Sequence, residues 1–114
     1  EPLVYNRLVA AVDCGRVVNP ALVKAEVESG MLTAIAQASA GAPSFRHGRI
    51  LGPLEPQLPT LARAPETLVE VLAGDGPAGG ASGLGSAAAP AAVGNALAAA
   101  TGRRLRSLPF APMS

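Results

Sequence analysis

The feature that most constrains the fold of this chain is a run of small residues near its C-terminal end. Alanine fills nine of the fifteen positions from 87 to 101, and Val93 and Leu97 mark one face of that stretch at helical spacing. Gly102 follows directly and is a typical helix C-cap. The sequence therefore predicts a thin helix over about 87–101, which can lie very close to a neighbouring element.

Composition limits what such a helix can pack against. The 114-residue chain is 49% hydrophobic but only 3% aromatic, so its core is made mostly of Ala, Val and Leu side chains. A small domain of this length buries a modest share of its surface. We therefore expect the chain to associate with a second copy or with another protein, and not to function as a solitary monomer.

Residue patterning predicts the main strands and a first helix. Apolar residues over 3–12 indicate a buried strand, and those over 67–73 indicate a second strand. Asn19 and Pro20 form a favourable helix start, and an apolar stripe with a spacing of four extends that helix to about residue 39. The stripe consists of Val23, Val27, Met31 (or Gly30) and Ile35.

Shorter segments complete the predicted fold. Residues 44–51 indicate a hairpin with Gly48 in its turn, and residues 52–66 indicate an extended crossing segment. A further short strand is predicted over 105–108. The order β-α-β-β-α predicts an α+β fold in which two helices pack on one small mixed sheet, and we treat residues 1–114 as a single small domain.

Charge and composition argue against several classes of function. The net charge is +1, and only Arg103, Arg104 and Arg106 cluster. Without interleaved aromatic residues these arginines do not predict a nucleic-acid-binding surface. No run of about 18 apolar residues indicates a membrane span. The sequence carries no recognisable export signal, so the choice between cytoplasm and periplasm is left open.

The cysteine, histidine and glutamate side chains do not predict a set of catalytic residues. The chain has one cysteine, Cys14, and one histidine, His47, and nothing in the sequence orients the imidazole toward the thiol. We expect a buried or loop cysteine, a solvated turn histidine and no metal site. Glu26 and Glu28 are two positions apart on the predicted helix, so they point in different directions and are expected to face solvent.

The stretch PAGGASGLGS at 77–86 is the remaining candidate for a functional site. Residues 74–79 match the pattern G-x-G-x-x-G of dinucleotide-binding loops, but Pro77 stands where a helix should open. No acidic residue follows Asp75 to hold a ribose. Glycine suits positions with positive φ or close backbone approach, so we interpret this loop as one that approaches another group closely.

Three sequence blocks resemble a known family. They are VAAVDCGRVVNP (9–20), ALVKAEVESG (21–30) and GNALAAATGRRLRSLP (94–109). In this order they resemble the C-terminal end of the large, molybdopterin-binding subunit of molybdenum hydroxylases, of the isoquinoline 1-oxidoreductase beta-subunit type in the xanthine dehydrogenase and aldehyde oxidase superfamily. The resemblance is weakest over 40–66. It implies that the chain is a C-terminal fragment or truncated paralogue of such a molybdopterin-binding domain.

The resemblance also implies roles for individual residues. In the family, the loop corresponding to 77–86 approaches the molybdenum, and a glutamate in it is the catalytic base. Gly83 stands at that position here, so no catalytic residue is assigned, and restoring a glutamate would raise turnover only if the backbone at Gly83 tolerates a side chain. Glu26 stands where the family often has a pterin-binding glutamine. The implied cofactor-binding residues are Glu26, Gly79, Gly80, Ala81, Ser82 and Gly83.

Two functions remain open at this point. The chain is part of a molybdenum-dependent oxidoreductase, completed by a partner or by the rest of the subunit, or it is a cofactor-free structural or interaction module derived from that fold. The missing glutamate favours the module, whereas the retained glycine loop favours the oxidoreductase. In both cases we expect the isolated chain to carry no molybdenum and to oxidise neither N-heterocycles nor aldehydes. The substrate is not readable, because the residues that shape its pocket would lie elsewhere.

Overall fold

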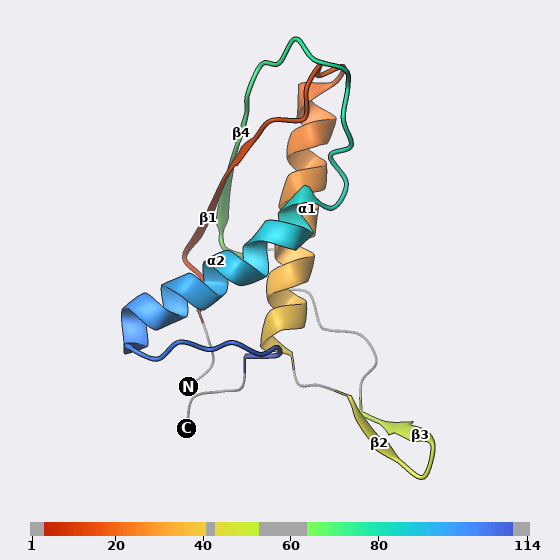
Figure 1. Cartoon of the computed structure of the whole chain (residues 1–114), viewed down its shortest axis with the longest axis vertical. Helices are drawn as coiled ribbons and strands as arrows, with labels where there is room; N and C mark the ends of the chain where they lie inside the picture. Colours follow the sequence, from red (N-terminus) through yellow and green to blue (C-terminus); the bar gives the residue numbers. More distant parts are fainter. Residues whose placement is uncertain (1–3, 41–42, 53–63, 111–114) are drawn as a thin grey trace.

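The computed structural model describes residues 4–40, 43–52 and 64–110 (Figure 1). Two helices and two small sheets confirm the predicted α+β class, but the strands form two separate pairs instead of one mixed sheet. β1 and β4 are parallel neighbours, and β2 and β3 form an antiparallel hairpin. The elements in chain order are β1 (Arg7–Val12), α1 (Pro20–Ser39), β2 (Ser44–Arg46), β3 (Arg49–Leu51), β4 (Glu66–Val71) and α2 (Leu84–Thr101).

Helix α1 follows the sequence prediction closely. The side chain of Asn19 caps its start, because Oδ1 accepts a hydrogen bond from the backbone N–H of Leu22 at 3.2 Å. The predicted stripe forms the core face: Val27, Met31 and Ile35 are buried. The helix is therefore defined at its start by local capping and along its length by its apolar periodicity.

Helix α2 begins earlier than predicted. Its first residue is Leu84 instead of a residue near 87, because Gly83 adopts a φ of +128° that lets the chain turn directly into the helix. The frequent glycines of residues 77–86 predict a loop up to residue 86. The end of the helix agrees with the prediction, since Gly102 is a left-handed C-cap with a φ of +71°.

The orange-to-yellow α1 and the cyan-to-blue α2 cross in Figure 1, and glycine residues of both helices lie at the crossing. A Cβ atom on Gly85 would lie 2.3 Å from the carbonyl oxygen of Val27 and 2.9 Å from the backbone nitrogen of Met31. On the opposite helix, a Cβ atom on Gly30 would lie 3.1 Å from the backbone nitrogen of Ser86. The backbones therefore approach more closely than side chains at these positions would permit.

The parallel pair β1–β4 packs one face toward the helices. Leu8, Ala10 and Val69 lie on this face and contact the buried core. The other face is open: Val9 and Leu68 are direct neighbours in the register, and they are 69% and 47% exposed. Because two strands alone are marginally stable in water, the helices provide most of the stabilisation of this pair.

The segment after α2 does not form the strand predicted over 105–108. In the structure this segment is irregular and leads to Phe110, whose backbone N–H donates to the carbonyl oxygen of Ala38 at 2.7 Å. The segment is thus held against the C-terminal end of α1, where it has no neighbouring strand. This contact between distant parts of the chain has no local sequence signal.

The hairpin β2–β3 agrees with the prediction for residues 44–51. His47 and Gly48 form its two-residue turn with φ values of +49° and +73°, the positive values typical of tight hairpin turns. The predicted crossing segment 52–66 falls mostly outside the described residues. Within the described ranges, no helix is both long and apolar enough to traverse a membrane.

The glycine crossing gives a stability prediction. Gly85→Ala should lower the free energy of unfolding by about 1–3 kcal/mol, the usual effect of overpacking, because the added methyl group overlaps the backbone of α1. Urea unfolding followed by circular dichroism measures the change. Gly76→Ala is the control, since its Cβ atom would meet open space; equal losses for both variants would contradict the close helix approach.

Candidate functional site

The glycine loop lies beyond the carboxyl ends of β1 and β4, where open parallel sheets usually bind their ligands. The loop is fastened to the turn that follows β1. The backbone N–H of Gly79 donates to the carbonyl oxygen of Cys14 at 2.8 Å, and that of Arg16 donates to the carbonyl oxygen of Gly76 at 3.1 Å. The two connections therefore form one backbone-rich surface at this end of the fold.

Two further glycines permit this close contact. Gly15 has a φ of +72°, and a Cβ atom on it would lie 2.1 Å from the carbonyl oxygen of Pro77. A Cβ atom on Gly74 would lie 3.0 Å from the Cα atom of Gly15. Asp13 also stabilises the turn, because its Oδ1 atom accepts from the N–H of Gly15 at 3.1 Å. No local sequence signal indicates that the turn from Asp13 to Gly15 anchors the loop, because the contact joins residues that are far apart in the chain.

The predicted loop residues do not all lie in the same environment. Gly79 is held against Cys14, and Ala81 is partly buried. Gly80, Ser82 and Gly83 are exposed, and a Cβ atom on Gly80 or Gly83 would meet no atom of this chain. Gly83 needs glycine for its positive φ, whereas nothing in the described residues requires glycine at position 80.

Helix α1 brings the predicted residue Glu26 toward this region. Glu26 is exposed and directly precedes Val27, whose carbonyl oxygen lies under Gly85 in the first turn of α2. The same turn has no side-chain cap, so its first N–H groups carry the positive end of the helix dipole. The start of α2, into which the loop leads, therefore lies against α1 at the residue after Glu26.

The expectation that Glu28 faces solvent is wrong. Its Oε1 atom accepts a hydrogen bond of 2.6 Å from the hydroxyl of Thr67, and both side chains are partly buried. Thr67 lies in β4, so this bond joins α1 to the parallel strand pair. Glu28 is thus a structural acceptor, and the pairing of distant residues could not be read from helix periodicity.

The remaining reactive residues stay apart. Cys14 is buried, with 7% of its surface exposed. The sequence had left open whether this cysteine is buried or lies in a loop. His47 is exposed in the turn of the hairpin, which projects away from the helices in Figure 1. In the part of the chain that the structure describes, no three His, Cys, Asp or Glu side chains gather as a possible metal site.

Residues 74–79 match the pattern G-x-G-x-x-G, and Pro77 within them indicated that no helix opens there. No helix opens within residues 74–79, since α2 starts only at Leu84. Gly74 and Gly79 pack against the turn after β1 instead. A pyrophosphate placed by this motif would therefore lack the helix start that a dinucleotide-binding loop provides.

A concave surface also runs between β1 and α2; we call it the β1–α2 groove. Its volume is about 780 Å³, and Val27 and Met31 of α1 contribute to its lining. The α2 side of the groove is formed largely by small residues, including Ala88, Ala92 and Ala96. Among the described residues β1 pairs only with β4, so the other edge of β1 has no strand partner.

This end of the fold can line a bound group, but its position 83 carries no base. Exposed glycine backbone at Gly80 and Gly83 permits a rigid group to come close. Proton transfer at position 83 would need a titratable side chain, which glycine lacks. The described loop therefore fits a cofactor as a lining surface and does not fit the proton-transfer role of the hydroxylase loop.

Comparison of the sequence with models of protein families finds no match, and comparison with curated proteins also finds no significant match. The molybdopterin-binding subunit therefore remains an interpretation of the three sequence blocks.

The backbone at Gly83 predicts the effect of restoring a carboxylate. Gly83→Glu should lower the free energy of unfolding by about 1–3 kcal/mol, because a side chain at a φ of +128° is strained. The backbone at Gly83 therefore does not readily tolerate a side chain, and we do not expect a glutamate there to raise turnover. Ser82→Glu adds the same charge one residue earlier and serves as the control. Equal unfolding midpoints for the two variants in urea would contradict the strain.

Proposed function

We propose that this chain is the C-terminal part of the molybdopterin-binding subunit of a molybdenum hydroxylase-type oxidoreductase. In this role residues 79–83 line the molybdenum face and Glu26 lies on the pterin side. One observation carries the proposal. The glycine loop leads into the first turn of α2, which packs on α1 at Val27, the residue after Glu26, and the loop and Glu26 are what the family resemblance assigns to the cofactor.

The glycines of the loop support a lining role. Gly76 and Gly80 have ordinary backbone angles, and Cβ atoms on them would meet open space. Packing inside this chain therefore does not explain these glycines, whereas close approach by a group outside the chain does. The molybdenum cofactor would supply the redox chemistry when bound. This chain would position it through backbone N–H groups and the Ser82 hydroxyl, while any proton transfer would need a residue from elsewhere.

Purification from the native host tests this function. A tag placed after Ser114 at the native locus should recover a longer polypeptide whose reading frame continues upstream of Glu1, with about one molybdenum per chain by elemental analysis. The 114-residue chain expressed alone should contain none, because the pterin is held mostly by other domains. Recovery of a short polypeptide without molybdenum from the native host would contradict the proposal.

The β1–α2 groove favours a second candidate function, that of a cofactor-free interaction module. Ala88, Ala92 and Ala96 of α2 are exposed within this chain although they line an apolar surface. Apolar surfaces of this kind mark interaction sites in many soluble proteins. A second copy that covers residues 87–100 would bury on the order of 1,000 Å² or more in total, as stable interfaces do.

Self-association tests this alternative. The purified chain should sediment as a dimer or larger assembly, and Ala92→Glu should weaken association by at least about tenfold because it buries an unpaired charge in the groove. Ala25→Glu is the control, since Ala25 is exposed on α1 and lies outside both residues 87–100 and the groove lining. Sedimentation velocity that shows a monomer for the unmodified chain at high concentration would argue against association between copies.

A further inference from the structure

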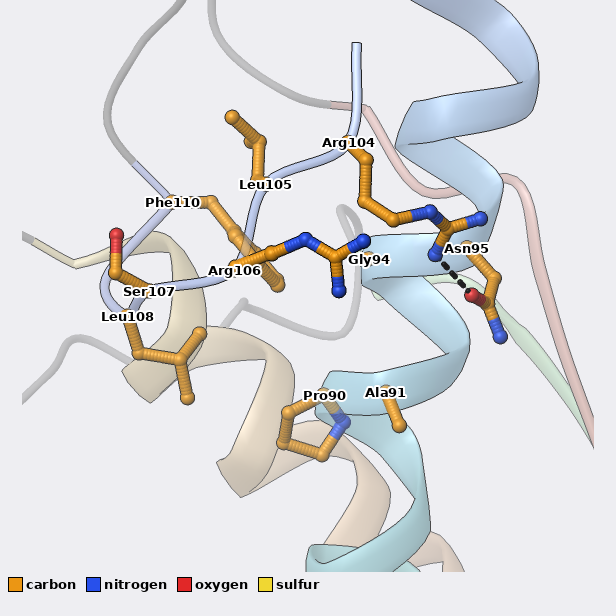
Figure 2. A pocket seen from close by; sticks show the side chains of 10 residues that line it. All are labelled: Pro90, Ala91, Gly94, Asn95, Arg104, Leu105, Arg106, Ser107, Leu108 and Phe110. Carbon is orange, nitrogen blue, oxygen red and sulfur yellow. Dashed lines mark hydrogen bonds between the residues drawn. The ribbon is translucent and has the colours of Figure 1, made fainter.

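A separate pocket lies on another face of α2, between this helix and the segment that follows it (Figure 2). Its volume is about 400 Å³, within the range of small-molecule sites. Helix α2 contributes Pro90, Gly94 and Asn95, and the following segment contributes Arg104, Arg106 and Phe110. None of these residues belongs to the glycine loop or to the β1–α2 groove.

Contacts with both helices hold this pocket together. The backbone N–H of Phe110 donates to the carbonyl oxygen of Ala38 at 2.7 Å, and the Phe110 ring is buried, with 6% of the residue exposed. Its Cζ atom would lie 3.3 Å from a Cβ atom on Gly94, so glycine provides the space for the ring. The segment is therefore fixed against α1 and α2.

The polar part of the pocket is cationic. Figure 2 shows both guanidinium groups, of Arg104 and Arg106, turned toward α2 at Gly94 and Asn95. The Nη1 atom of Arg104 donates to Oδ1 of Asn95 at 2.8 Å, which orients that side chain. No aspartate or glutamate lines the pocket. Among the described residues, the ion pair found is that of Arg7 with Glu66, far from these arginines in sequence.

The charge balance identifies the kind of ligand. Two guanidinium groups beside one cavity repel each other, and an anion placed between them would relieve that repulsion. A phosphate monoester carries a charge of about −1.5 to −2 near neutral pH, which matches two arginines better than the single charge of a carboxylate. Guanidinium groups also bind phosphate oxygens with paired, charge-assisted hydrogen bonds.

We propose that this pocket binds a small phosphate monoester with an apolar body. Arg104 and Arg106 bind the phosphate oxygens, and Asn95 keeps Arg104 in position. The apolar body rests against Pro90 and Leu108, whose side chains line the same cavity. Leu108 is 57% exposed, so a ligand in this place would remove apolar surface from water.

Calorimetric titration of the 114-residue chain with phenyl phosphate tests the proposal. We expect saturable binding at one site, weakened about tenfold or more by Arg106→Gln because a charge-assisted contact is lost. Arg103→Gln is the matched control: it removes the same charge from the same segment, but Arg103 does not line the pocket. We expect this control to bind within about twofold of the unmodified chain, since Arg103 is exposed and its charge outside the pocket is screened by solvent and salt.

Further measurements separate this site from general charge attraction and from loss of structure. Circular dichroism should show the same helix content in each variant, and Arg106→Lys, which keeps the charge without the planar fork, should show an intermediate loss. Benzyl alcohol should not bind, and benzoate should bind more weakly than phenyl phosphate. Absence of saturable binding, equal weakening in the Arg103→Gln control, or benzoate binding as tight as phenyl phosphate would overturn the proposal.

Discussion

The close crossing of α1 and α2 is the contact on which the rest of this structure depends. Gly85 lies over the backbone of α1 at Val27 and Met31, at a distance that no side chain at that position would allow. With few large side chains in its core, the chain brings the two backbones together at this crossing. The crossing fixes the position of α2 and therefore places both the β1–α2 groove and the pocket beside the following segment.

A second set of glycines determines the end of the fold where the candidate site lies. Gly15 and Gly74 allow the turn after β1 to touch the loop after β4, and Gly79 completes the contact through its hydrogen bond to Cys14. Both parallel strands end here, so two connections from distant parts of the chain form one surface. Gly80 is different, because no contact within the described residues accounts for it. That difference is the reason for proposing that a group outside the chain approaches the loop.

Helix α2 presents different chemistry on different faces. Toward β1 it offers an alanine surface without charged groups, which suits another protein surface. Toward the segment after the helix it offers Gly94 and Asn95 beside two arginines, which suits an anionic small molecule. The groove and the pocket share no lining residue.

Features that are encoded within a few neighbouring residues could be predicted from the sequence. Asn19 marked the start of α1, the apolar stripe marked its core face, and Gly102 marked the end of α2. The sequence also located the glycine loop, which in the structure ends at Gly83 because α2 starts at Leu84. The tertiary structure alone decided the early start of α2, the bond between Glu28 and Thr67, and the irregular path of the segment that carries Arg106. These features depend on contacts between residues far apart in the chain, whereas caps and periodicity depend on the backbone of one or two helical turns.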